Sequence, residues 1–155
     1  MELRKMEMNK LEFKKLYLLD TNIVSEPTRK NPDSKVVSNI DEKSLFSVIC
    51  APVWYELQKG VEILPKGKKK EILWNYNNDY VRTIYPILPY DEHCATLQAD
   101  IFARMLKNGT PVSTSDAQIA ATALANNLII VTRNTKDFEP IQKEFSLCVE
   151  NWFDA

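Results

Sequence analysis

Short apolar runs alternate with longer helical patterns along this chain. Apolar residues, many of them β-branched or aromatic, dominate residues 16–19, 45–50 and 128–132. Runs of this length and composition are typical of buried strands. Weaker runs at residues 86–90 and 145–149 indicate two further strands, and the prolines in the first of these favour an edge strand or a loop. The pattern predicts a central sheet of four to five strands.

Helical periodicity fills the intervals between these runs. Apolar side chains recur every three or four residues there, which places them on one face of a helix. The expected helices cover residues 23–26, 34–42, 52–64, 68–85, 91–107 and 116–127. Because strands and helices alternate, we expect an α/β fold with a mostly parallel sheet and right-handed crossovers.

Length and composition are those of one soluble domain. The 155 residues contain no repeat or flexible linker, and no apolar stretch approaches the roughly 18 residues of a membrane span. Residues 1–15 mix acids and bases and lack the apolar core of a signal peptide, so we expect a cytoplasmic protein. The three cysteines are widely spaced, which argues against a disulfide framework or a zinc site and predicts small buried side chains.

The charge distribution limits how a nucleic acid can bind. A formal net charge of −1 gives no general attraction for a polyanion, so such a partner needs a local basic patch. Lysines cluster at positions 66, 68, 69 and 70. A lysine run is usually a solvated face, so both interpretations stay open at this stage.

Four acidic residues from distant parts of the chain occupy comparable positions. Asp20 ends the first strand, and Asp137 follows the strand at residues 128–132. Glu56 and Asp116 lie within about one turn of the starts of their helices. Each acid alone has a simpler role as a helix cap, a dipole partner or a solvated residue. In a parallel sheet, however, these positions share the edge where ligands bind, and four independent caps have no reason to converge there.

A cluster of carboxylates needs compensation. Two such charges about 4 Å apart repel by about 4 kcal/mol at an effective dielectric near 20, so the cluster requires a cation or raised pKa values. Oxygen ligands suit Mg²⁺ or Mn²⁺ better than Zn²⁺. The single histidine, His93, cannot build a histidine-rich zinc site, and we expect it to be structural.

Three segments carry a resemblance to a known family. The segments LLDTNIVSE, VWYELQKGV and DAQIAATALANNLIIVTRNTKDFE resemble those of PIN-domain ribonucleases, specifically the VapC-type toxins of type II toxin–antitoxin systems. The resemblance extends from about residue 16 to 152. It implies a PIN-like three-layer α/β/α fold, with residues 16–155 as one domain and residues 1–15 as an extension of no assigned function. It also implies Mg²⁺-dependent endonucleolytic cleavage of structured RNA, with Mn²⁺ as a substitute.

The resemblance also assigns roles to individual residues. The positions that match the family's metal-binding and catalytic acids are Asp20, Glu56, Asp116 and Asp137. Asn134 is the second choice for the fourth position, and the number of metal ions and the identity of a general base, Asp116 or Glu56, stay open. Supporting positions are Asn22 and Ser115. Weaker candidates for RNA contact are Arg133, Lys68 and Lys69.

Other functions compete with a ribonuclease. A phosphoryl-transfer or signalling domain is disfavoured, because Asp20-Thr21-Asn22 lacks the second aspartate of a D-x-D motif and no lysine follows LIIVT. A non-catalytic PIN-like binding module and a structure-selective DNA nuclease stay in play, although the short chain favours a small ribonuclease.

The resemblance also implies partners, namely a cognate antitoxin protein and a second copy of the chain. An exposed aromatic face is one surface such a partner can use, and core packing is the competing role of the same side chains. The aromatic candidates are Trp54, Tyr55, Trp74 and Tyr76. Which RNA is cut, whether transfer, ribosomal or messenger RNA, stays open.

Overall fold

A computed structural model describes residues 14–154 of the chain. The extension predicted for residues 1–15 lies outside the described residues except for its last two. Within the described part, no helix is long and apolar enough to cross a membrane.

Five parallel strands form the central sheet, in the order β3-β2-β1-β4-β5. Their bounds are β1 (Tyr17–Leu19), β2 (Ser47–Cys50), β3 (Ile87–Leu88), β4 (Ile129–Val131) and β5 (Val149–Glu150). The first strand is central, because Tyr17 pairs with Ser47 on one side and Ile129 on the other. The predicted number of strands and the edge position of β3 are confirmed.

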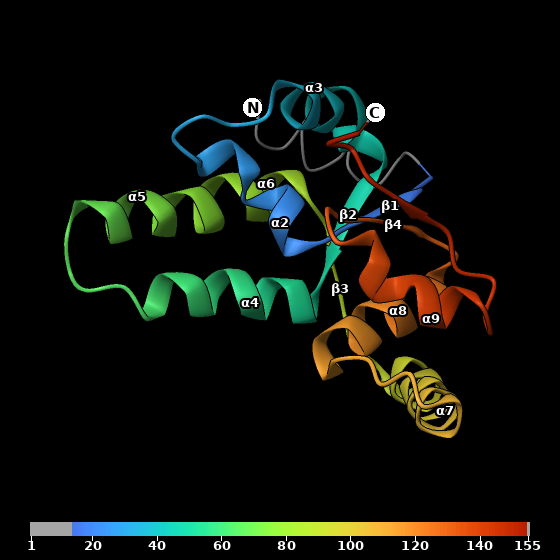
Figure 1. Ribbon diagram of the computed structural model, residues 1–155. Helices are drawn as coiled ribbons and strands as arrows, with labels where there is room; N and C mark the ends of the chain where they lie inside the picture. Colours follow the sequence, from blue (N-terminus) through green and yellow to red (C-terminus); the bar gives the residue numbers. More distant parts are fainter. Residues whose placement is uncertain (1–13, 155) are drawn as a thin grey trace.

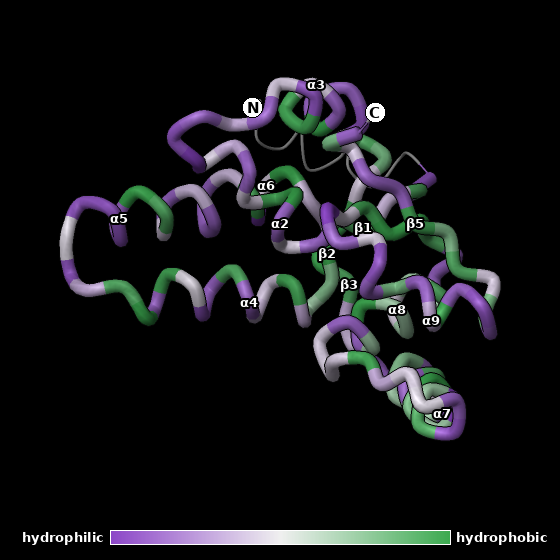
Figure 2. The backbone as a smooth tube through the Cα atoms, viewed as in Figure 1, coloured by the Kyte–Doolittle hydropathy of each residue, from purple (hydrophilic) through white to green (hydrophobic). Residues whose placement is uncertain are grey.

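The three inner strands, β1, β2 and β4, are mostly apolar because both faces of the sheet are covered. Leu18, Val48 and Ile130 have no exposed surface. Hydrophobic residues accordingly gather in the strands and in the helix α8 (Thr114–Asn126), whereas the outer loops are hydrophilic (Figure 2).

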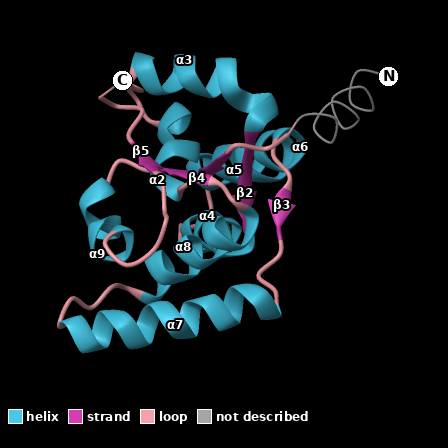
Figure 3. Ribbon diagram, turned by 90° about the vertical axis from the view of Figure 1, so that its right-hand side faces the viewer, coloured by secondary structure: helices cyan, strands magenta, loops and turns pink. Residues whose placement is uncertain are grey.

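Helices lie on opposite sides of this sheet. The remaining α-helices of the described chain are α2 (Thr21–Val24), α3 (Ser34–Lys43), α4 (Ala51–Glu62), α5 (Lys68–Asn75), α6 (Arg82–Ile84), α7 (Glu92–Asn108) and α9 (Glu139–Gln142). Figure 3 shows α3 on one side of the sheet and α7 on the other, with α8 between α7 and the strands. The hairpin of α4 and α5 projects away from the sheet (Figure 1).

The helix predicted for residues 68–85 is interrupted by a π-helix, Tyr76–Val81. The buried amide of Asn77 lies in this wider turn and donates to the Leu57 carbonyl of α4 at 3.0 Å. The hydroxyl of Tyr76 donates to the Val24 carbonyl at 2.5 Å. These polar contacts hold the π-helix against α2 and α4. Helical periodicity cannot reveal them, because they depend on where the partner carbonyls lie.

Three other boundaries or burial predictions are wrong. The last strand begins at Val149. The backbone N–H of Phe145 donates to the Ile141 carbonyl and that of Leu147 to the Phe145 carbonyl, so residues 145–147 form turns instead of pairing with β4. Part of the run at residues 45–50 is a 3₁₀ turn, Ser44–Phe46, so β2 starts at Ser47. Cys148 is exposed, whereas the other two cysteines are buried as expected.

Candidate active site

The strand order gathers the four predicted acids. Asp20 follows the central strand β1, and β2 and β4 on either side lead into α4 and into a 3₁₀ turn, Thr135–Phe138. Glu56 therefore comes from one side and Asp137 from the other. Asp116 lies in the first turn of α8, which packs against both α4 and β4. Because the sheet is parallel, all these segments start at one edge.

Asp20 is both a helix cap and a buried acid. The residue is only 8% exposed to solvent. Oδ1 accepts from the Thr21 backbone N–H at 2.8 Å, which caps α2. Oδ2 accepts from the Thr132 hydroxyl at 2.9 Å. The simpler role considered from the sequence is thus real, but it uses only one of the two carboxylate oxygens.

Burial raises the pKa of Asp20 to about 6. The hydrogen bonds from Thr132 and Thr21 act in the opposite direction, and the charges of Glu56 and Asp116 raise the pKa further. The two hydrogen bonds therefore do not offset the cost of burying the ionised carboxylate of Asp20. A cation at this edge would supply the missing charge.

Thr132 connects Asp20 to the supporting residue Asn22. Besides donating to Asp20, the Thr132 hydroxyl accepts from the Asn22 side-chain amide at 3.3 Å and from the Asn134 backbone N–H at 3.1 Å. The Asn22 side-chain oxygen in turn accepts from the Arg133 backbone N–H at 3.0 Å. This network joins the ends of β1 and β4 and fixes the direction in which Asp20 points.

Glu56 is held by two hydroxyl groups. Thr21 donates to Oε2 at 2.6 Å, and Ser115 donates to Oε1. The two donors lie on α2 and α8, so this carboxylate links three helices. Each of its oxygens still has a lone pair for a ligand, and the predicted supporting position of Ser115 agrees with this contact.

Asp116 is half-buried and close enough to Asp137 and Glu56 for their charges to raise its pKa. Burial raises its pKa first, followed by the charges of Asp137 and Glu56, while a hydrogen bond with Ser113 lowers it. Asp137 itself is exposed. Its charge therefore reaches Asp116, and the choice between Asp137 and Asn134 for the fourth position stays open.

Some predicted residues lie elsewhere. Lys68 and Lys69 begin α5 at the tip of the projecting hairpin, far from the end of β1 (Figure 1). The neighbouring Lys70 donates to the carbonyls of Glu62 and Leu64. These hydrogen bonds connect the start of α5 to the end of α4. The lysine cluster is therefore a feature of the hairpin and not of the acidic edge.

Two residues that hold the acids, Thr21 and Thr132, are absent from the sequence-based set. Their signal was present but weak: each directly adjoins a predicted strand end or acid, and Thr132 ends the apolar run at residues 128–132. A threonine there has the same appearance as an ordinary β-branched strand residue. Only the fold shows that its hydroxyl points to Asp20.

The donor set fits a hard divalent cation, because its side chains offer only oxygen. Among residues 14–154, however, no three acidic, histidine or cysteine side chains stand close enough together to hold one ion. A cation bound at this edge would require the carboxylates to turn toward it. Burial, and to a smaller extent the charges of neighbouring acids, raise the pKa values of Asp20 and Asp116, so their ionised forms are disfavoured without such a cation.

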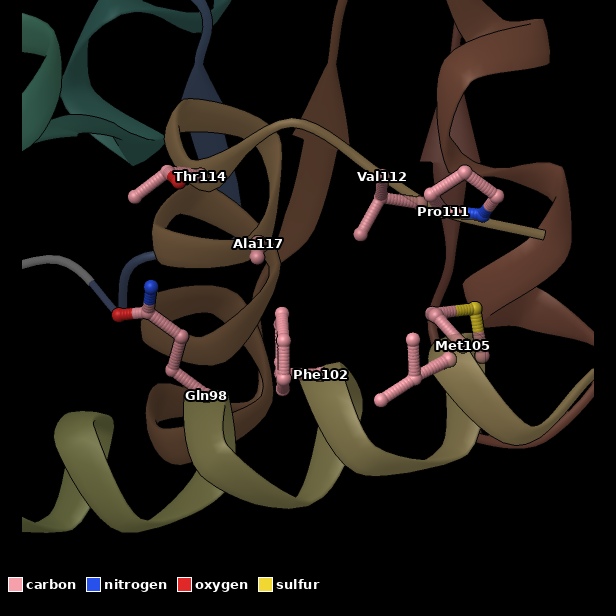
Figure 4. Close-up of a pocket in the computed structure, with 8 residues that line it drawn as sticks. Gln98, Phe102, Met105, Pro111, Val112, Thr114 and Ala117 are labelled. Carbon is pink, nitrogen blue, oxygen red and sulfur yellow. The ribbon is translucent and has the colours of Figure 1, made fainter. Parts of the chain in front are cut away.

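Two cavities border this region. One, of about 240 Å³, starts at Thr21 and Glu56 and continues between α2, α4 and α5 to Leu73 and Asn77. The other, of about 90 Å³, lies between α7 and α8 and is shown in Figure 4, where Gln98 and Phe102 extend from α7 toward Thr114 and Ala117. Glu56 is the acid that lines the first cavity, whereas no acid lines the second.

Comparison with known proteins agrees with this geometry. The family model described as the PIN domain matches residues 17–144. The chain belongs to the PIN-domain family. This PIN domain is similar to toxin FitB from Neisseria gonorrhoeae, with 36% identity over 126 residues, 79% of this chain and 91% of that protein.

Two further relatives give the same assignment. The tRNA(fMet)-specific endonuclease VapC of Shigella flexneri is 32% identical over 136 residues, 88% of this chain and 97% of that protein. A solved structure of FitAB bound to an IR36 DNA fragment superimposes with a TM-score of 0.81 at 31% identity, covering 89% of this chain and 96% of that chain. The predicted PIN-like fold and the predicted class, a ribonuclease toxin of VapC type, are confirmed.

The substitution Asp20→Asn is expected to raise the thermal stability of the metal-free PIN domain near pH 7.5. With a pKa of about 6, Asp20 binds its proton more tightly in the folded than in the unfolded chain. The stability that protonation provides is complete below about pH 4 and is lost as pH rises through 6. Ionisation of Asp20 then lowers the unfolding free energy by roughly 3 kcal/mol. Thermal denaturation in EDTA measures the effect.

The same comparison near pH 4.5 is the control, because Asp20 is then largely protonated in the folded protein. The difference in melting temperature between the two proteins is expected to shrink at this pH. An equal difference at both pH values would show that the ionised carboxylate is not what destabilises the metal-free protein.

Proposed function

We propose that this protein cleaves RNA phosphodiester bonds at the edge of the sheet that carries Asp20, with Mg²⁺ as its cofactor. The observation that carries the proposal is a buried, under-compensated carboxylate, Asp20, whose pKa is raised further by acids from two other helices. Such an arrangement lowers the stability of the protein unless a cation binds. The PIN-domain relatives support the choice of a nuclease over a signalling domain.

Mg²⁺ held at this edge would lower the pKa of a bound water and offset the charge that builds on the phosphate. Asp20 and Asp116 are the principal ligands of the proposal, joined by Glu56 and Asp137. Thr132 and Asn22 hold Asp20 in a fixed orientation, and Thr21 and Ser115 do the same for Glu56. Either Glu56 or Asp116 takes the proton from the attacking water.

RNA is the proposed substrate because the relative from Shigella flexneri is named as a tRNA(fMet)-specific endonuclease. The formal net charge of −1 gives no general attraction for RNA or DNA, so the substrate has to be bound through local contacts. A structured RNA presents unpaired loops that can reach a small exposed site. DNA cleavage is the alternative outcome of the test.

Purified protein is expected to cleave structured RNA when Mg²⁺ or Mn²⁺ is supplied and to lose this activity in EDTA. The variants Asp20→Asn and Asp116→Asn are each expected to lower the cleavage rate about a hundredfold or more, because each removes a charge that holds the cation. Single-turnover cleavage of a labelled RNA, with a DNA of the same sequence alongside, measures this.

The matched control is Asp41→Asn, which removes an exposed carboxylate from α3 on another part of the surface. It is expected to cleave as fast as the parent protein. Equal rates for all variants, or cleavage that resists EDTA, would contradict the proposed site, and preferential cleavage of the DNA would contradict the substrate.

We further propose that a cognate antitoxin docks in the cavity between α2, α4 and α5. This cavity of about 240 Å³ contains Glu56 at one end and apolar side chains such as Leu73 and Val61 along it. Trp74 and Ile72 are exposed on the same hairpin. A partner segment in this position would cover apolar surface and reach the acidic site at once.

Gly60 offers a way to fill this cavity. It lines the cavity on α4, and a Cβ placed there meets no atom within 4 Å. The substitution Gly60→Phe is therefore expected to leave the fold and RNA cleavage intact while weakening antitoxin binding about tenfold or more. Isothermal titration with the purified cognate antitoxin measures the affinity.

Glu62→Phe on the same helix is the matched control, because the Glu62 side chain is exposed and does not line the cavity. This variant is expected to bind as the parent does. Undiminished binding by Gly60→Phe would place the antitoxin on another surface.

The homodimer stays a prediction, and α7 supplies a surface for it. Four exposed apolar residues recur at helical spacing on this helix: Ala95, Ala99, Phe102 and Leu106. Phe102 and Leu106 are 63% and 68% exposed and border the smaller cavity. A helix face of small and large apolar residues is self-complementary across a twofold axis.

A further inference from the structure

An arginine at the rim of the acidic site stacks on an aromatic ring. The Cζ atom of Arg133 lies 4.7 Å from the centroid of the Phe153 ring. Arg133 is the second residue after β4, and Phe153 is the third after β5. Because β4 and β5 are parallel neighbours, both side chains lie at the edge of the sheet that carries Asp20.

The backbone of Arg133 is fixed directly to the site. Its N–H donates to the side-chain oxygen of Asn22 at 3.0 Å. The preceding residue, Thr132, donates its hydroxyl to Asp20. The backbone of Arg133 is therefore within one residue of the network that orients the buried acid.

The ring that supports Arg133 is also held in place. The N–H of Phe153 donates to the Asn151 side-chain oxygen at 2.9 Å, and the amide of Asn151 donates to the Arg133 carbonyl at 3.5 Å. Trp152, only 1% exposed, anchors the segment and donates to Glu150 at 3.1 Å. The segment after β5 thus positions the ring relative to Arg133.

Within residues 14–154, no carboxylate forms an ion pair with the guanidinium of Arg133. Arg104 provides the contrast: it lies 4.8 Å above Phe145 but pairs with Asp100 at 2.9 Å and with Glu144 at 3.5 Å. A stacked, exposed and unpaired arginine beside a group of acids is suited to a ligand that carries both a flat ring and a negative charge.

We propose that Arg133 and Phe153 form a subsite for an unpaired nucleotide of the RNA next to the cleaved bond. Stacking on Phe153 fixes the guanidinium plane, whose edge donates to a phosphate and whose outer face receives the base. A base inside a duplex cannot reach this face, so the subsite selects single-stranded loops. The inference rests on the proposed cleavage of RNA and names the part of the RNA that the site recognises.

The subsite also resolves an electrostatic conflict. Four carboxylates at one edge repel the phosphates of an incoming RNA when the cation is absent. An unpaired guanidinium at the rim attracts a phosphate without cancelling the acids that bind the cation, because it is held on Phe153 and not among them. We therefore assign to this pair substrate binding and not chemistry.

Two variants separate stacking from charge. Phe153→Leu keeps an apolar side chain but removes the ring, and Arg133→Lys keeps the charge but removes the planar face. On a hairpin RNA, each is expected to raise KM about tenfold and to change kcat by less than about twofold. The matched controls, Phe145→Leu and Arg104→Lys, alter an arginine–phenylalanine pair away from the site and are expected to leave both constants unchanged.

A binding measurement without cleavage keeps this inference separate from the proposed function. The same five proteins, wild type included, are titrated in EDTA with the hairpin RNA, with a fully paired duplex RNA, and with hairpins that carry one abasic nucleotide at each loop position in turn. The hairpin is expected to bind Phe153→Leu and Arg133→Lys about tenfold more weakly than wild type. At one loop position, the abasic RNA is expected to bind wild type and Phe153→Leu equally.

The subsite is overturned if both variants bind the hairpin as tightly as wild type, if the control pair weakens binding equally, or if duplex RNA is affected as much as the hairpin. Absence of cleavage by the wild type would contradict the proposed function alone, since the titration in EDTA still tests the subsite.

Discussion

Burial raises the pKa of a carboxylate when no cation replaces the water around it. Asp20, at the end of the central strand, is such a carboxylate. It follows β1, which lies between β2 and β4, and it is only 8% exposed. The acids contributed by α4 and α8 add repulsion instead of relief. The rest of the site is best understood as the set of contacts that keeps this unfavourable group in one orientation.

Four uncharged side chains provide those contacts. Thr132 and Asn22 hold Asp20, whereas Thr21 and Ser115 hold Glu56, and together they connect α2, α4, α8 and the end of β4. Hydroxyl and amide donors fix a carboxylate but do not neutralise it, whereas a lysine or an arginine would neutralise it. The arrangement therefore leaves negative charge available for a divalent cation, while the one arginine at the rim is stacked on Phe153 instead of paired with an acid.

Much of this arrangement could be predicted from the sequence, and the reasons are local. The runs at residues 16–19 and 128–132 identify β1 and β4, and an acid after a buried strand identifies Asp20 as a candidate. The hydroxyl of Thr132 could not be assigned, because a threonine at a strand end is equally a packing residue. Nor could the π-helix at Tyr76–Val81, since it depends on where the Leu57 carbonyl lies. Nor could the exposure of Phe102 and Leu106 be predicted, because periodicity defines an apolar face of α7 but not how much of it α8 covers.

We propose that the carboxylates at this edge close on one divalent cation. The most direct measurement is the anomalous difference map of a crystal grown with Mn²⁺. We expect a peak at the carboxyl end of β1, about 2.0–2.2 Å from carboxylate oxygens of Asp20 and Asp116, with both side chains turned toward it. A map with no peak there, or with a peak only at carboxylates elsewhere on the surface, would contradict the account.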